Sequence, residues 1–230
     1  MENMKKIAFL ILLIVPFSCT RENIEDGDGL PYYEFTQVEK NQLIKEPKVG
    51  DEVVFKNQDN ELLKFVVGSS KTGKATYTTV ISNFLGSYAT DRFHYDSQEI
   101  EFWSNGQYTT DRYQIKIQKY PIDCNYNVHP PISGSPTFYG YFTFPLWNGY
   151  RGTDPGLNTI SIDFNKPTTT LSFNGKTYTK VCIFLSNRTE VLIPSIALPT
   201  HPRNVHVIYY DFNAGIIGFD DLIGKNWRLE

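Results

Sequence analysis

Apolar and polar residues alternate with a period of two over many short stretches of this chain. The clearest examples are residues 113–117 and 160–164, where every second side chain is Ile, Tyr or Phe. Such alternation places apolar side chains on one face of a β-strand and polar side chains on the other. No apolar pattern with helical spacing lasts three turns, and the best helical candidate, residues 38–45, is short. The pattern therefore predicts half-buried strands.

Residues 168–230 show strands and turns most clearly. Asn174-Gly175 separates two runs, 171–173 and 177–181. Asn-Gly supplies the two residues of positive φ that a type I′ hairpin turn requires, so a tight hairpin is expected here. Further strands are predicted at residues 205–210, 215–219 and 226–229.

The same signals predict strands earlier in the chain, at residues 51–56, 62–67, 76–83, 97–103, 113–120, 139–144 and 157–164. A Pro- and Gly-rich aromatic insertion occupies residues 121–155. Many short strands separated by turns are typical of sandwiches and barrels. The sequence predicts an all-β fold: a single antiparallel β-sandwich or barrel-like domain over residues 49–230, with a loop-rich aromatic insertion.

The composition agrees with one globular domain and argues against a nucleic-acid partner. The 230 residues include 15 Tyr and 16 Phe, which is ample material for a core, and the net charge is -3. Lys and Arg are scattered along the chain. Because binding to a phosphate backbone needs a basic stripe, we expect no DNA or RNA partner.

The N-terminus has the layout of a secretory signal peptide. Lys5-Lys6 precede an apolar run at residues 7–15, and Pro16-Phe17-Ser18-Cys19 follow. The run is too short to span a bilayer, which needs about 20 apolar residues. We expect a signal peptide over residues 1–18. In a plain signal peptide Cys19 would be incidental.

Ser18-Cys19 resembles the end of a bacterial lipobox, with Pro16 and Phe17 in place of the usual aliphatic and small residues. That resemblance implies that Cys19 becomes the N-terminus and carries a thioether-linked diacylglycerol and an acyl chain. The chain would then contact the membrane through this anchor, with residues 19–48 as a tether and lead-in.

Two further stretches resemble lipoproteins of the Bacteroidota. The acidic residues of TRENIEDGDG, interrupted by Arg21, resemble the surface-export signal behind the lipidated cysteine. The C-terminal run with NGKTY, GIIGF and GKNW is similar to small lipoproteins of that phylum. The resemblance implies a lipid-anchored protein of the outer membrane or cell surface. It implies no activity.

The remaining cysteines, Cys124 and Cys182, leave two alternatives open. They can form one disulfide in an oxidising compartment. Alternatively both are buried free thiols, because Cys182 lies in the apolar run 181–185, where cysteine behaves as a small hydrophobe.

Motifs for nucleotide or metal chemistry fail on their context. Residues 68–75 match G-x-x-x-x-G-K, but Ala75 replaces the Ser or Thr that holds Mg²⁺, and a β-branched run follows where a helix is needed. We expect a solvated loop between strands there. None of the four histidines, His94, His129, His201 and His206, has the spacing of a metal site. The sequence therefore predicts no cofactor and no metal.

Catalytic signatures are equally weak. There is no G-x-S-x-G elbow, and Cys124 with His129 is too little to define a nucleophile and its base. Glu99 and Glu101 should share one strand face, opposite Ile100 and Phe102, which favours a solvated position over a glycosidase cleft.

The aromatic insertion holds the candidate binding residues. Tyr139, Tyr141, Trp147 and Tyr150, with Arg151, are suited to a platform for a sugar or to a hydrophobic groove. The alternative is that these rings cover an open end of the sheet. We expect any binding site to involve residues 121–155 rather than the C-terminal strands.

The function expected from these observations is non-catalytic binding or an accessory role at the envelope. Its partner would be a glycan, a hydrophobic ligand or an envelope protein. The alternative is a periplasmic or surface hydrolase whose site is assembled from dispersed residues.

Overall fold

The computed structural model describes residues 24–25, 27–83, 86–104, 112–120, 136–144, 159–185 and 205–230. These residues form thirteen strands and one helical turn, which confirms the predicted antiparallel all-β fold. The elements are β1 (Ile24–Glu25), β2 (Pro31–Tyr33), α2 (Gln37–Lys40), β3 (Glu52–Lys56), β4 (Leu62–Asn83), β5 (Gly86–Ser104), β6 (Arg112–Tyr120), β7 (Thr137–Thr143), β8 (Thr159–Ile162), β9 (Thr169–Phe173), β10 (Lys176–Leu185), β11 (Val205–Asp211), β12 (Gly215–Asp221) and β13 (Asn226–Leu229).

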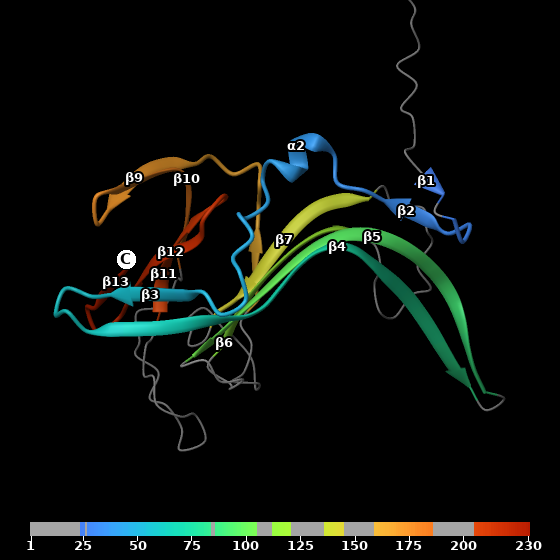
Figure 1. The fold of residues 1–230 in the computed structure, drawn as a ribbon, viewed down its shortest axis with the longest axis horizontal. Coiled ribbons are helices and arrows are strands. Elements are labelled where there is room, and N and C mark those ends of the chain that lie inside the picture. The colour runs from blue at the N-terminus through green and yellow to red at the C-terminus, as the bar shows by residue number, and fades with distance from the viewer. Residues whose placement is uncertain are drawn as a thin grey trace, which may run out of the picture.

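Eleven of the strands form one curled antiparallel sheet, in the order β8-β7-β6-β5-β4-β3-β13-β12-β11-β10-β9. The sheet bends into a half-barrel, so its two wings face each other (Figure 1). Strands β1 and β2 lie off this path, and β2 pairs in parallel with β5.

Aromatic side chains from the two wings meet inside the curl. Phe142 of β7 stacks on Tyr210 of β11, with ring centroids 5.6 Å apart. Phe144, just after β7, lies 5.0 Å from Phe219 of β12. Because β7 is far from β11 and β12 in the strand order, these contacts hold the two wings together over the main core.

The predicted hairpin between β9 and β10 is confirmed. Phe173 pairs with Lys176, so the connection has two residues. Asn174 and Gly175 have φ values of 51° and 77°, as a type I′ turn requires.

The prediction of a loop at residues 68–75 is wrong. These residues lie within β4, which is continuous from Leu62 to Asn83, and β5 pairs with it as far as Gly86. The far ends of both strands extend away from the rest of the sheet (Figure 1). Residues 86–96, for which no strand was predicted, belong to β5 and form part of this strand pair. The strand also removes the nucleotide-loop interpretation, because no helix follows Lys74.

The residues ahead of β3 pack against the sheet. We call residues 27–48 the N-terminal segment. Its helix α2 is shorter than the expected helix at 38–45 and begins with a capping box formed by Thr36 and Glu39. Tyr33, Phe35 and Ile44 are buried, so packing begins ahead of the expected boundary at residue 49. The helix in the described residues falls far short of the length needed to cross a membrane.

Candidate functional site

The structure describes part of the predicted binding set. Tyr139 and Tyr141 lie on β7, and both side chains are half-buried. Trp147, Tyr150 and Arg151 lie outside the described residues, as does most of the segment 121–155. The two tyrosines of β7 are therefore the part of the predicted set whose surroundings the structure shows.

Strand register shows which side chains accompany these tyrosines. Tyr141 is opposite Lys116 of β6, and Lys116 is opposite Glu99 of β5. Tyr139 is opposite Gln118. Directly opposed residues in antiparallel strands project from the same face. The set on this outer face, here called the tyrosine face, comprises Glu99, Glu101, Trp103, Arg112, Gln114, Lys116, Gln118, Tyr139 and Tyr141.

The opposite face of the same strands is core. Ile100, Ile115 and Phe142 alternate with members of the tyrosine face and are almost completely buried. Packing on the inner side therefore holds the three strands that carry the tyrosine face, so its side chains project from a rigid support.

Hydrogen bonds orient the polar groups of the tyrosine face. Gln118 Nε2 donates to the hydroxyl oxygen of Tyr139, and Gln114 Nε2 donates to Glu99 Oε1. Lys116 Nζ lies 3.7 Å from Glu99 Oε2. Cross-strand contacts of this kind fix amide and carboxylate planes, so the face presents preorganised donors and acceptors.

Trp103 is a member of the tyrosine face that the sequence analysis did not identify. Its ring covers Gly68 so closely that a Cβ at position 68 would lie 2.0 Å from ring atom Cε2. The pairing of β4 with β5 shifts register at this point, between Val67 and Ser69. Trp103 Nε1 donates to Glu101 Oε2 at 3.3 Å. An isolated Gly in a strand pattern can mark such a bulge, so Gly68 was the signal in the sequence for the register shift beneath Trp103.

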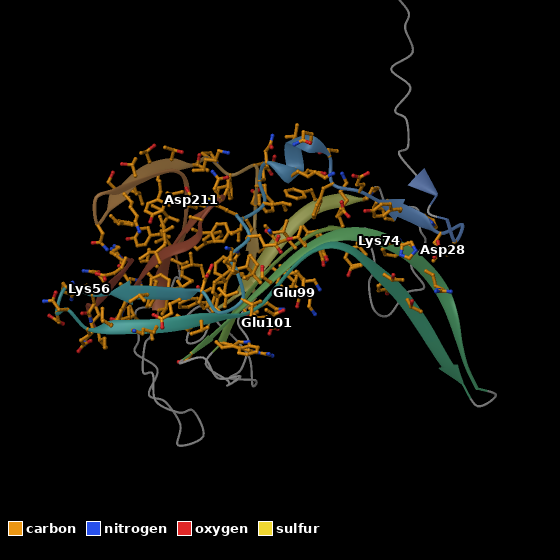
Figure 2. All side chains as sticks on the ribbon, in the orientation of Figure 1. Asp28, Lys56, Lys74, Glu99, Glu101 and Asp211 are labelled. Atoms are coloured by element: carbon orange, nitrogen blue, oxygen red, sulfur yellow. The ribbon has the colours of Figure 1, made fainter. Side chains whose placement is uncertain are left out.

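Glu99 and Glu101 occupy the face expected of them, opposite Ile100 and Phe102, and Figure 2 labels both carboxylates. Each has a basic partner, because Glu101 Oε1 lies 3.7 Å from Arg112 Nη1 and Glu99 contacts Lys116. Their side chains are 35% and 19% exposed, respectively, so both are partly covered. Two carboxylates that are each matched by a cation act as fixed acceptors.

His94 and Cys182 lie in the described part of the chain, and both are packed as structural side chains. His94 is buried, with Nδ1 2.9 Å from Thr76 Oγ1 and Nε2 2.9 Å from Asp28 Oδ2. Cys182 is a buried free cysteine, and burial raises the pKa of its thiol. Its predicted partner Cys124 lies outside the described residues, as do Cys19, His129 and His201. The described residues contain no group of three or more His, Cys, Asp or Glu placed to hold a metal.

Comparison with protein-family models, with curated proteins and with solved structures finds no match to this chain. The tyrosine face combines flat rings with oriented carboxylates, amides and cations on one rigid sheet. Such a surface can stack against a ring that has apolar C–H faces and bond to hydroxyl groups at its edge.

Proposed function

We propose that this protein is a lipid-anchored envelope protein that binds glycans without catalysis, and that the tyrosine face is its binding surface. The observation that carries the proposal is the sharing of one sheet face by Tyr139, Tyr141 and Trp103 with hydrogen-bonded Glu99 and Gln114.

The chemistry of a sugar matches this surface in two ways. Its C–H faces stack on aromatic rings, which bury a large area at small cost in side-chain entropy. Its hydroxyl groups donate to carboxylates and exchange hydrogen bonds with amides. Because Gln118 and Gln114 already orient their partners, little ordering is left to oppose binding.

The envelope location rests on the N-terminal sequence. Lys5-Lys6, the apolar run 7–15 and Ser18-Cys19 support export followed by lipid attachment at Cys19. Metabolic labelling with an alkyne fatty acid tests this step. Wild type and Cys124→Ala should carry the label, and Cys19→Ala should not. Equal labelling of all three would overturn the anchor.

Glycan binding is tested with a panel of polysaccharides, comparing wild type with Tyr141→Ala. Removing a central aromatic contact should weaken binding about tenfold or more. Tyr178→Ala is the matched control, because Tyr178 is a half-buried tyrosine on β10, in the other wing of the sheet. It should bind as wild type does.

Two outcomes contradict the proposal. If no polysaccharide binds, or if both tyrosine variants bind equally, the tyrosine face is not a glycan site. Turnover on a panel of glycosides, esters and peptides would favour the hydrolase instead, and mutation of Glu99 and Glu101 would then test whether this face carries the reaction.

A further inference from the structure

Strand β13 is short and forms few pairs with its two neighbours. It pairs with β12 only at residues 218–220 and with β3 only at Lys56 and Phe55. Glu230 N then donates to Val54 O at 2.9 Å, and the pairing ends. These pairings do not include the first residues of β3 and of β12.

A cavity of about 490 Å³ lies beside β13. Its inner end is formed by Phe102 and Tyr113, which are buried and stack with ring centroids 4.2 Å apart. Ile216 and Leu229 add apolar wall from the C-terminal strands. The volume falls within the range of about 300–1,000 Å³ that small-molecule sites occupy. The hydroxyl group of Tyr113 is uncharged at neutral pH, and burial raises its pKa further above the ordinary value.

The outer part of the cavity carries charges that cancel in pairs. Glu52 and Lys64 both line it, with Oε2 and Nζ 3.5 Å apart and with side chains 57% and 50% exposed. Glu230 also lines it, and its Oε1 lies 3.5 Å from Nζ of Lys56. A ligand carboxylate or ammonium would compete with one of these ion pairs. An uncharged group with hydroxyls can bond to both signs without separating either pair.

We infer that this cavity, which is separate from the tyrosine face, is a second binding site that takes a small amphipathic molecule with an apolar chain and an uncharged, hydroxyl-bearing end. The chain packs on Phe102, Tyr113 and Ile216. The hydroxyl end lies among Glu52, Lys64 and Glu230, where water also reaches it.

A substitution in the turn after β11 can fill the cavity without changing the core. Ala214 lines the cavity and is exposed. Asp211 Oδ1 accepts the backbone N–H groups of Asn213 and Ala214 at 2.9 and 3.0 Å, and these bonds do not depend on either side chain. Ala214→Trp therefore places a large ring in the cavity. Asn213→Trp adds the same ring to the neighbouring exposed position, which does not line it.

The experiment uses the full chain and the fluorescent probe N-phenyl-1-naphthylamine, with monododecanoylglycerol as competitor. Wild type and Asn213→Trp should bind the probe saturably at one site and release it to the competitor. Ala214→Trp should bind the probe at least about tenfold more weakly than wild type does, because its ring clashes with the ligand. Circular dichroism checks that all three proteins are folded.

A second measurement needs no variant. Dodecanoate and dodecylamine carry a chain of the same length with a charged end, and each should displace the probe from wild type about two- to fivefold less well than monododecanoylglycerol. Absence of saturable probe binding to wild type would overturn the site. Unchanged binding by folded Ala214→Trp would do so as well, and preference for either charged ligand would overturn the assigned ligand class.

Discussion

The inner face of β5 buries two kinds of side chain in two different ways. At Ile100 and Phe102 it is apolar and packs inside the half-barrel. At His94, Asp96 and Gln98 the same face is polar and equally buried, but there it contacts the N-terminal segment. One strand face therefore packs in the hydrophobic core at one end and forms hydrogen bonds to the N-terminal segment at the other.

The polar end is matched to the backbone that crosses it. Gln98 accepts from Ile44 N at 3.0 Å and donates to Ile44 O at 2.9 Å, as a neighbouring strand would. Asp96 accepts from Phe35 N at 2.9 Å and from the Tyr32 hydroxyl at 2.6 Å. Phe35 and Ile44 lie outside β2, so polar side chains of β5 satisfy their backbone groups where the segment crosses this face. The two ends of β5 show that a buried position does not require an apolar residue when the backbone packed against it needs hydrogen-bond partners.

The largest effect is expected from the apolar region. Phe219 is fully buried and lies 5.3 Å from Phe55 and 5.0 Å from Phe144. Phe219→Ala should lower the free energy of unfolding by about 3–5 kcal/mol, because the two wings relax only partly around the lost ring. Urea denaturation measures this. A loss below about 1 kcal/mol would show that the wings are not held together by this packing.

A smaller and more local effect is expected at Gln98. Gln98→Ala leaves the Ile44 amide and carbonyl without their partners, which should cost about 1–3 kcal/mol and loosen the N-terminal segment. Hydrogen exchange should accelerate at residues 30–45 while β11 and β12 stay protected. Gln114→Ala, an amide truncation on the outer face, is the matched control and should leave residues 30–45 unchanged. Uniform acceleration across the sheet would remove the distinction between the two regions.

The smallest effect is a dependence on pH at the end of the polar region. The hydrogen bond with His94 lowers the pKa of Asp28, which is labelled in Figure 2, from its ordinary value. A carboxyl whose pKa is lower when folded stabilises the fold above its unfolded pKa of about 3.9, and that contribution is lost as the pH falls through the folded value. Asp28 is exposed, so the effect is confined to its own surroundings.

Hydrogen exchange at residues 27–33, followed from pH 6 to pH 3 and corrected for the intrinsic rate, measures this contribution. Opening should increase in wild type toward the acid end. Asp28→Asn should show the more open state throughout, with less change across the range. An identical acid response in both proteins would mean that another group controls this end of the segment.

Part of the candidate site was predictable for a local reason. Tyr139 and Tyr141 alternate with Phe142, so a shared face followed from the period of two alone. Trp103 and the two tyrosines lie on one face because β6 pairs with β5 on one side and with β7 on the other, and register is a property of two strands. The cavity beside β13 depends on six separate strands and left no pattern in the sequence.

The sequence by itself determined the all-β class, most of the strands and the Asn174-Gly175 turn, because these depend on residues within a few positions of each other. Only the tertiary structure decided that residues 68–75 and 86–96 are strand, since residues 68–75 owe their conformation to pairing with β5, and residues 86–96 to pairing with β4 and, at His94 and Tyr95, with β2. It also decided how far the sheet curls and where it stays open, because both follow from contacts between strands that are far apart in the chain.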